Sequence, residues 1–439
     1  MTQTNYIHEK VHLVDYQPLT TEQLLSRYQE TRHFSEELAQ RLKTEDYVIQ
    51  SMPDVSPTKW HLAHTSWVFE TFILGPANIG YQSPEPLYAY LFNSYYISAG
   101  DRFYRPERGL LSRPTVEEVY TYRSFVDEAM GKFIKRLDQK GLDKWSSLIE
   151  LGIHHEQQHQ ELILTDIKHV FSKNPLRPAY YPKDEERNLK DQCPVLLWNN
   201  YPEGVYTIGH NDTGFAYDHE SPAHRVFLEA FQLASRPVTN GEYIDFIEDG
   251  GYQEAEFWLS DGWALLDEAG WKAPLYWENR DGDWWIMTLS GMLQVDLNEP
   301  LCHVSYYEAD AYASWAGARL PNEEEWEVAV GDVKVRGNFI ESKSFHPTSW
   351  LEDDLSHKMY GDVWEWTKSH YSPYHGFEPA KGAIGEYNGK FMCNQFVLRG
   401  GSCATSKSHI RSTYRNFFPA DARWQFSGIR LAKDGGKIK

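Results

Sequence analysis

The feature that most constrains this chain is a stretch, residues 153–171, that neither proline nor glycine interrupts. Apolar residues recur through it at three- and four-residue steps, which predicts one amphipathic helix. His155 and His159 are four residues apart, so this helix would carry both imidazoles on one face, one turn apart. Two imidazoles so placed form half of a metal site. Glu161 lies roughly 160° from His159 around the helix axis, so we expect it to orient a histidine or to cap a neighbouring helix.

Three more helices are expected earlier in the chain, at residues 20–50, 56–72 and 115–138. The second should begin with Ser56 as its N-cap and Pro57 as its first helical residue, where the missing N–H of proline leaves no bond unmade. Four long amphipathic helices that end near residue 172 predict a four-helix bundle.

The sequence changes character after residues 175–194, a segment rich in Pro, Lys, Asp and Glu that is typical of a linker. Beyond it, short β-type runs alternate with turn residues, which predicts an α+β domain with long loops. The strands are expected at residues 204–209, 224–228 and 231–234, and the helices at residues 240–247 and 306–316. We therefore expect two domains, a helical bundle at residues 1–180 and an α+β domain at residues 195–439.

The composition limits the partners of these 439 residues, because the net charge is −20 at pH 7. Nucleic acid and anionic membranes both require a basic face, so neither is expected as a partner. The four cysteines, Cys193, Cys302, Cys393 and Cys403, form no C-x-x-C pair, which is typical of reduced thiols in a cytoplasmic protein. Residues 1–9 are polar, unlike a signal peptide, and no run approaches the ~18 apolar residues that a membrane helix needs.

The third metal ligand has to come from another helix. Of the 18 histidines, His61 and His64 lie on the expected second helix, and metal sites in bundles use inward-facing residues of facing helices. Trp60 and Trp67 flank His64 at steps of four and three, which favours His64 as the inward residue, although His61 could also face inward. Three imidazoles without a thiolate suit zinc, iron or copper, so the ligand type alone does not select the metal.

The helix with His155, His159 and Glu161, paired with the Trp-His-Leu-Ala-His segment at residues 60–64, resembles the DinB-type bundle of the ergothioneine-pathway sulfoxide synthases. The second half resembles their C-type-lectin-like domain, which is related to formylglycine-generating enzymes and sulfatase modifiers. The segments that carry this second resemblance are residues 235–243, 319–327, 361–367, 398–403 and 427–432. Together the two resemblances cover the chain almost end to end.

The resemblance implies a mononuclear non-haem iron(II) held by His64, His155 and His159. The family uses O2 to join a thiol sulfur to C2 of the imidazole of hercynine (trimethylhistidine), and it oxidises the same sulfur to a sulfoxide. Three neutral imidazoles leave an octahedral iron three positions, enough for an imidazole, a thiolate and O2. The thiol chemistry of formylglycine-generating enzymes is not implied, because the cysteines show no such pairing. We expect the second domain to form a wall of the substrate pocket.

Roles for individual residues follow from the same resemblance. Gln158 and Asn416 match contacts to the hercynine carboxylate. The trimethylammonium group cannot form hydrogen bonds and needs aromatic faces. The aromatic residues available for it are Phe417, Phe418, Tyr371, Tyr374, Trp364 and Trp366. The two tryptophans are expected to fill the core instead.

The reaction also needs a proton source near the metal, and a tyrosine can donate a proton or an electron there. Tyr95 and Tyr96 follow Asn-Ser and resemble the Tyr-Tyr pair that family members using free cysteine carry in this loop. We therefore predict that Tyr95 and Tyr96 are catalytic. Tyr371 and Tyr374 are the alternative, because they lie in the segment where other members carry this tyrosine.

The thiol substrate is predicted from one position at which this chain departs from the family's sequence pattern. Members that use γ-glutamylcysteine resemble one another in an acidic residue where this chain has Phe418, so a partner for the glutamyl ammonium is missing and free cysteine is favoured. The cysteine carboxylate would bind an arginine, and the candidates are Arg105, Arg108 and Arg113.

Several alternatives stay open at this point. The same reaction could use γ-glutamylcysteine, or the protein could be an ovothiol-type 5-histidylcysteine sulfoxide synthase that takes unmethylated histidine. A different class is a zinc-dependent thiol transferase or hydrolase on a DinB-type bundle. A binding module without catalysis would use His155 and His159 only structurally.

Overall fold

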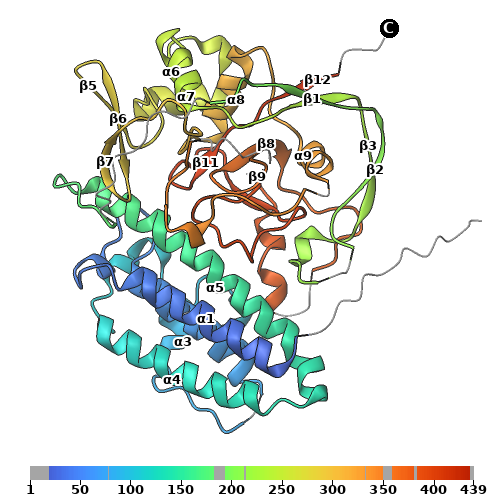
Figure 1. Cartoon of the computed structure of the whole chain (residues 1–439). Helices are drawn as coiled ribbons and strands as arrows, with labels where there is room; N and C mark the ends of the chain where they lie inside the picture. Colours follow the sequence, from blue (N-terminus) through green and yellow to red (C-terminus); the bar gives the residue numbers. More distant parts are fainter. Residues whose placement is uncertain are drawn as a thin grey trace, which may run out of the picture.

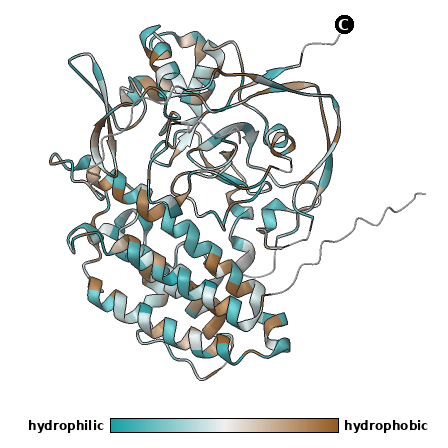
Figure 2. Ribbon diagram, in the orientation of Figure 1, coloured by the Kyte–Doolittle hydropathy of each residue, from teal (hydrophilic) through white to brown (hydrophobic). Residues whose placement is uncertain are grey.

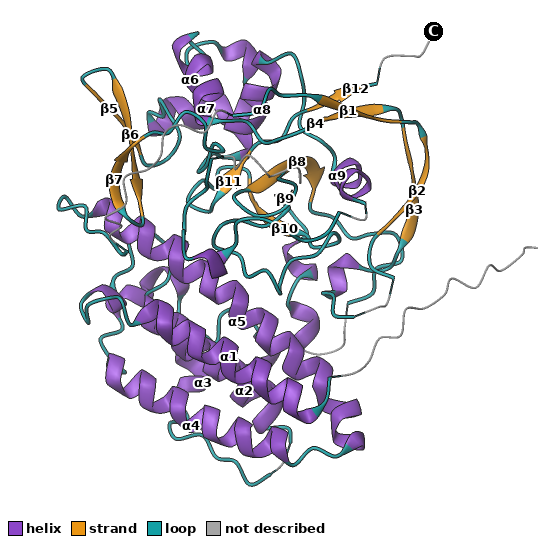
Figure 3. Ribbon diagram, viewed as in Figure 1, coloured by secondary structure: helices purple, strands orange, loops and turns teal. Residues whose placement is uncertain are grey.

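The computed structural model describes residues 19–77, 79–181, 193–211, 214–331, 333–349, 358–379 and 383–435. A helical bundle forms one half of the molecule and an α+β domain forms the other (Figure 1). Figure 3 shows that strands occur only in the second half, where loops make up much of the chain. The predicted fold class is therefore confirmed. None of the helices in the described part of the chain combines the length and apolarity needed to cross a membrane.

The bundle has four long helices with one short helix between the second and third. They are α1 (Thr21–Ala39), α2 (Thr58–Phe69), α3 (Tyr88–Leu91), α4 (Val116–Lys135) and α5 (Gln139–Lys173). Capping boxes begin α1 at Thr20 and α4 at Thr115, which satisfies N–H groups that the helix itself leaves unpaired. Both hydrophobic and hydrophilic residues recur along α1 and α5 (Figure 2), as expected of helices that bury one face and expose the other.

Two local predictions for the bundle are wrong, and one is confirmed. The first helix ends at Ala39, well before residue 50. The helix predicted over residues 153–171 is confirmed as part of α5, which begins earlier, at Gln139, and runs through Gly152. This glycine is a packing requirement, because a Cβ there would lie 2.5 Å from Cε1 of Phe69 on α2. Ser56 is not the N-cap of α2; that position is Pro57, and the backbone N–H of Ser56 donates instead to Oδ2 of Asp166 at 2.8 Å.

A buried carboxylate joins three of these helices. Glu156 on α5 is 0% exposed and accepts hydrogen bonds from Arg32 of α1 at 2.9 Å and Arg123 of α4 at 2.5 Å. Ser35 of α1 donates to the same carboxylate at 2.7 Å. Burial opposes ionisation of Glu156, but Arg123 and Arg32 hold its pKa at about 2. Glu156 of α5 thus shares its charge between the two buried arginines, which are also paired with Asp127 of α4 and Glu36 of α1.

The α+β domain is built around a four-stranded sheet of order β10-β9-β8-β11, in which β8 and β9 are antiparallel and β11 joins β8 in parallel. Two three-stranded sheets, β1-β4-β12 and β5-β6-β7, and the β2-β3 ribbon surround it. The strands are β1 (Trp198–Tyr201), β2 (Gly204–Ile208), β3 (His224–Leu228), β4 (Phe231–Ala234), β5 (Trp277–Arg280), β6 (Asp283–Thr288), β7 (Gly291–Gln294), β8 (Trp364–His370), β9 (Gln395–Arg399), β10 (Asn416–Pro419), β11 (Ser427–Gly428) and β12 (Ala432–Asp434). The helices are α6 (Asn240–Glu248), α7 (Ser260–Ala269), α8 (Tyr306–Trp315) and α9 (Glu323–Val330).

Five of these elements, β2, β3, β4, α6 and α8, lie where the sequence predicts them, with ends shifted by at most one residue. The helices α7 and α9 and the strands β1 and β5–β12 were not predicted. Residues 182–192 of the expected linker lie outside the described residues. Just before them, the side chain of Tyr180 donates to the carbonyl of Leu38 at 2.8 Å, and its backbone N–H donates to the carbonyl of Leu289 at 2.9 Å. This part of the segment therefore contacts both halves.

The two halves meet along α5 (Figure 1). Glu161 accepts hydrogen bonds from Nε1 of Trp364 at 2.7 Å, from Ser402 at 2.8 Å and from Thr405 at 2.8 Å, all in the α+β domain. The expectation that Glu161 orients a histidine or caps a helix is therefore wrong. Its role is to fix α5 against the second domain.

Replacing Glu156 with glutamine should lower the free energy of unfolding by about 3–5 kcal/mol at pH 7, because Arg32 and Arg123 would lose their one fully buried counter-charge and keep only the partly exposed Asp127 and Glu36. A carboxylate whose folded pKa is about 2, against an ordinary 4.5, stabilises the fold above pH 4.5 and loses this effect as the pH falls towards 2. Urea denaturation at several pH values should thus show the wild-type advantage shrinking below pH 4.5.

The matched control is Glu128→Gln, which removes an exposed carboxylate paired with Lys132 on the same helix. It should leave the urea midpoint nearly unchanged. Equal effects of the two substitutions would show that the buried network does not stabilise the bundle.

Candidate metal centre

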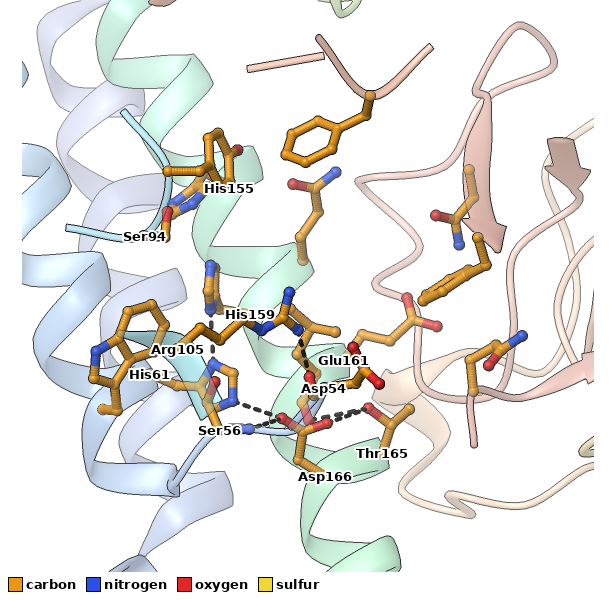
Figure 4. Close-up of a pocket in the computed structure, with 18 of the residues that line it drawn as sticks. Asp54, Ser56, His61, Ser94, Arg105, His155, His159, Glu161, Thr165 and Asp166 are labelled. Carbon is orange, nitrogen blue, oxygen red and sulfur yellow. Dashed lines mark hydrogen bonds and ion pairs between the residues drawn. The ribbon is translucent and has the colours of Figure 1, made fainter. Parts of the chain in front are cut away.

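Three imidazoles converge between α2 and α5. His64 lies on α2, His155 and His159 lie on α5, and their candidate ligand atoms all lie within 4.8 Å of one another. Nε2 of His64 is 3.3 Å from Nε2 of His155. Two nitrogen ligands at right angles, each about 2.1 Å from one ion, would be about 3 Å apart. The arrangement therefore fits a single metal ion, and Figure 4 shows His155 and His159 one turn apart on the same helix.

The three imidazoles are prepared to bind a metal because they are neutral. Burial lowers the pKa of His155 to about 4 and lowers the pKa values of His64 and His159 well below the ordinary range. The Nδ1–H of His64 donates to the carbonyl of Phe92 at 2.6 Å, which leaves the lone pair on Nε2. The ring of His64 also stacks on Trp60 at 4.6 Å, which fixes its plane. A neutral three-nitrogen set of this kind suits a borderline divalent ion such as iron(II) or zinc.

A cavity of about 450 Å³ lies beside the histidines. His155, His159 and Gln158 on α5 form its inner wall, and the loop with Tyr95 forms part of another wall. The α+β domain supplies the remaining wall through Trp364, Tyr387, Phe391, Tyr414, Asn416 and Phe418. Since both halves contribute side chains, the cavity depends on their contact along α5.

Gln158 and Asn416, the predicted carboxylate contacts, both line this cavity. Nε2 of Gln158 donates to the hydroxyl of Tyr414 at 2.7 Å, and its Oε1 accepts from the hydroxyl of Tyr387. Oδ1 of Asn416 accepts the backbone N–H of Phe417 at 2.9 Å. The two amides are therefore held in place, and each has an N–H that these bonds leave for a ligand.

The predicted aromatic contacts separate into two groups. Phe418 lines the cavity, whereas Phe417, Tyr371 and Tyr374 do not. Neighbouring residues of a strand point to opposite faces, so β10 directs Asn416 and Phe418 to the cavity and Phe417 away from it. The ring of Phe417 stacks on Tyr371 at 4.0 Å.

The hydroxyl of Tyr371 hydrogen-bonds Nδ1 of His219 at 2.6 Å, and that of Tyr374 donates to Glu323 at 3.3 Å. Both tyrosines thus belong to a buried network on the far side of β10. This corrects our expectation that Tyr371, Tyr374 and Phe417 contact the substrate.

The Tyr95–Tyr96 pair is divided between the cavity and the core. Tyr95 lines the cavity, and Tyr96 stacks behind it at 4.6 Å, against Trp67 and Phe72. Asn93 holds the turn through bonds with the backbone of Tyr96, at 3.1 Å to its N–H and 2.9 Å to its carbonyl. Burial raises the pKa of both phenols, so both keep their protons at neutral pH.

Arg108 is a buried cation that faces the cavity. Its side chain is 3% exposed, lies 3.4 Å over the ring of Trp60 and donates from Nη1 to Oγ of Ser56 at 2.9 Å. Nε and Nη2 have no hydrogen-bond partner among the residues that the structure describes. Burial and the neighbouring Arg105 lower the pKa of Arg108, as expected for a cation without a counter-ion.

The other two candidate arginines are less suited to bind an anion. Arg105 lines the cavity, but its side chain donates to the carbonyl of Asp54. Arg113 does not line the cavity, and its side chain donates to the carbonyl of Ser112 at 3.1 Å. The unused donors of Arg108 make it the better site for a carboxylate.

Sequence analysis missed Asp166, Tyr387 and Tyr414 and considered His61 only as an alternative metal ligand, yet all four line the cavity. Asp166 follows His159 by seven residues, a helical spacing that marks the same face and could have revealed it. Tyr387 and Tyr414 are distant in sequence from every other member of the site and show no local pattern.

Substituting His155 or His159 with alanine should abolish stoichiometric binding of iron(II) or zinc, because two imidazoles cannot hold the ion as three do. The α+β domain should stay folded, since its contacts with Glu161 remain. Metal content after anaerobic reconstitution and near-ultraviolet circular dichroism measure the two effects. The control is His33→Ala, an exposed histidine on α1. Full metal occupancy in either variant would show that the three histidines are not the ligands.

Comparison with known proteins supports the division into two halves. Residues 27–163 match the DinB superfamily, and residues 199–356 and 354–435 match the sulfatase-modifying factor enzyme 1-like domain. The chain is 28% identical over 280 residues to the formylglycine-generating enzyme of Mus musculus, which covers 53% of this chain and 74% of that protein.

Other relatives match nearly the whole chain. The hercynine oxygenase of Mycolicibacterium smegmatis is 32% identical over 416 residues, which covers 88% of this chain and 92% of that protein. The hercynine oxygenase of Mycobacterium tuberculosis is 31% identical over 411 residues, which covers 87% of this chain and 92% of that protein. With this identity over both domains, the chain belongs to the hercynine oxygenase family.

Proposed function

We propose that the protein is an O2-dependent, non-haem iron(II) sulfoxide synthase of ergothioneine biosynthesis. It would join the sulfur of cysteine to C2 of the hercynine imidazole and release hercynylcysteine S-oxide. The observation that carries this proposal is the set of three neutral imidazoles, His64, His155 and His159, two of which, His155 and His159, line a cavity of about 450 Å³. The names of the relatives support hercynine as a substrate and oxygenation as the reaction class.

The proposed reaction balances without an external reductant. The S–H bond of cysteine and the C2–H bond of hercynine break, and a C–S bond and an S–O bond form. One atom of O2 enters the sulfoxide and the other leaves as water with the two hydrogens. A cavity for this reaction has to hold two amino acid derivatives and admit O2, but it needs no site for a redox cofactor.

The chain's own residues would bind and orient both substrates. Iron(II), when bound to the three histidines, supplies O2 activation and a position for the thiolate. Gln158 and Asn416 would donate to the hercynine carboxylate, with Gln158 fixed by Tyr387 and Tyr414. The face of Phe418 is available to the trimethylammonium group. Holding both substrates beside one ion replaces a collision of three molecules with an oriented reaction.

Arg108 supports cysteine as the thiol substrate. Its guanidinium is buried, lines the cavity and has donors at Nε and Nη2 without partners in the described part of the chain. A carboxylate would satisfy both donors and neutralise the charge. Phe418 offers no acceptor for the ammonium group that γ-glutamylcysteine would add, which favours the smaller thiol.

Tyr95 would hold the proton that converts the second oxygen atom of O2 to water. Its phenol lines the cavity and is protonated at neutral pH because burial raises its pKa. The α+β domain holds the loop in place, since Glu386 accepts from the backbone N–H groups of Ile97 and Ser98, both at 2.9 Å. Tyr96 packs behind the ring and limits its movement.

One reconstitution experiment tests the proposal. The metal-free protein is loaded anaerobically with iron(II), mixed with hercynine and cysteine and exposed to air, and the product is identified by mass spectrometry. We expect hercynylcysteine S-oxide, and a kcat/KM for cysteine about tenfold or more above that for γ-glutamylcysteine.

The other outcomes separate the alternatives. Preference for unmethylated histidine, with sulfur at C5, would indicate the ovothiol-type reaction. Activity with zinc and no O2 consumption would indicate a thiol transferase. Metal binding without turnover of any thiol would indicate a binding module.

Tyr95→Phe should keep iron and substrate binding but lower sulfoxide formation by about 10²-fold or more, because the proton donor is lost. The consumed O2 would then oxidise the thiol alone. Tyr96→Phe should have a smaller effect, since the ring of Tyr96 stacks behind that of Tyr95 and does not line the cavity. Product ratios by mass spectrometry distinguish the two, with Tyr90→Phe, an exposed tyrosine before the same loop, as the control. Undiminished sulfoxide formation in the Tyr95/Tyr96 double variant would exclude both residues.

A further inference from the structure

A line of hydrogen bonds leads away from the metal centre through His61 to Asp166. Nδ1 of His159 lies 2.8 Å from Nδ1 of His61, and Nε2 of His61 lies 3.0 Å from Oδ2 of Asp166. Figure 4 shows His61 between the other two side chains, with contacts to both. His61 and Asp166 are both buried, so water does not compete for these bonds.

The chemistry of the partners determines where each proton lies. Oδ2 of Asp166 also accepts the backbone N–H of Ser56 at 2.8 Å, so this oxygen is an acceptor and the shared proton belongs to Nε2 of His61. With this proton on Nε2, the acceptor nitrogen of the His61 imidazole is Nδ1. The proton between the two histidines therefore belongs to Nδ1 of His159, which leaves the lone pair of His159 on Nε2.

The three candidate metal ligands differ in what their second ring nitrogen contacts. His64 donates to a backbone carbonyl, that of Phe92. Nδ1 of His155 has no hydrogen-bond partner among the described residues. His159 alone is connected to a carboxylate, through an intervening imidazole. Partners of this kind fix the tautomer and ring orientation of a ligand and raise its basicity.

We propose that His61 and Asp166 are positioning residues for the metal ligand His159. They keep the proton of His159 on Nδ1 and turn its Nε2 lone pair towards the ion. Through the two hydrogen bonds, the negative charge of Asp166 makes the imidazole of His159 a more basic ligand. This inference rests on the metal centre of the proposed function and extends it beyond the three ligands. His61 is not itself a ligand, because both of its nitrogens are engaged.

The same carboxylate connects the metal centre with the proposed thiol site. Asp166 fixes the backbone of Ser56, whose Oγ accepts from Arg108 at 2.9 Å. A change at Asp166 would thus affect both a metal ligand and the arginine. A substitution of His61 leaves the contact between Asp166 and Ser56 in place, so it tests the effect on His159 separately.

The test uses four single variants of the full chain. His61→Phe keeps the ring volume but removes both hydrogen bonds, and His61→Gln can restore them, since an amide accepts at Oε1 and donates at Nε2. Asp166→Asn removes the charge, and its amide can donate to His61 and so reverse the order of the protons, as in the histidine of a catalytic triad. His169→Gln is the matched control, because His169 is a buried histidine of α5 that bonds Ser51 at 2.6 Å, outside the cavity.

Cobalt(II) titration of the metal-free proteins gives the affinity, and the visible spectrum of the bound cobalt reports its ligand geometry. We expect His61→Phe and Asp166→Asn to weaken cobalt binding by about 10- to 100-fold and to alter the spectrum. His61→Gln should recover most of the affinity, and His169→Gln should match the wild type. Thermal unfolding of each metal-free variant identifies any that fails to fold. If Asp166→Asn does not fold, the two His61 variants decide.

Wild-type affinity and spectrum in His61→Phe would overturn the proposal, as would a loss no larger than that of His169→Gln. Failure of the wild type to bind cobalt would reject the metal centre and this inference with it. Normal cobalt binding by the wild type, without turnover of hercynine, would reject the proposed function but leave the role of His61 and Asp166 to be decided by the titration.

Discussion

The geometry of the metal centre depends on how α5 is rotated about its own axis. Three acidic side chains fix this rotation. Glu156, Glu161 and Asp166 are five residues apart, so they point in different directions around the helix. Each meets donors from a different part of the protein, namely the bundle arginines, the loops of the α+β domain and the start of α2. A buried carboxylate without its donors is strongly destabilising, so α5 cannot turn without losing all three sets of bonds. The directions of His155 and His159 follow from this.

The site belongs to neither half alone. The bundle supplies the imidazoles and Arg108, and the α+β domain supplies Asn416, Phe418 and the tyrosines that hold Gln158. A small error in how the domains meet would displace one substrate relative to the metal, and reactions between bound groups are sensitive to such displacements. This explains why Glu161 forms three hydrogen bonds across the interface. The interface is part of the active site geometry.

The sequence predicts the parts of the site that depend on one helix at a time. The spacing of His155 and His159 is a local property, and the tryptophans around His64 indicate its buried stripe. Which side chains of β10 face the cavity is not a local property of the sequence. Alternate residues of a strand point to opposite faces, and either set can face the cavity until the neighbouring strands are known. This is why the sequence offered both Phe417 and Phe418 as substrate contacts, although of the two Phe418 alone lines the cavity. The role of Glu161 was predicted wrongly and that of His61 was left open for a related reason. Their partners come from segments far away in sequence.

The charges around the cavity explain why the two proposed carboxylate sites differ. The chain has a net charge of −20, and the cavity is lined by Arg102, Arg105 and Arg108 as well as by Asp54, Glu161 and Asp166. Arg108 keeps donors at Nε and Nη2 that no described residue uses, so an anion would bind at this one point and not through a general positive field. Hercynine carries a permanent cation beside its carboxylate, and an arginine at that end would repel the trimethylammonium group. The neutral amides of Gln158 and Asn416 can bind the carboxylate without this repulsion. Cysteine would present a carboxylate and a thiolate, and its protonated amine can turn towards solvent or an acidic group. The buried guanidinium of Arg108 therefore suits the thiol substrate, and the difference in charge between the two sites would direct each substrate to its own side of the metal.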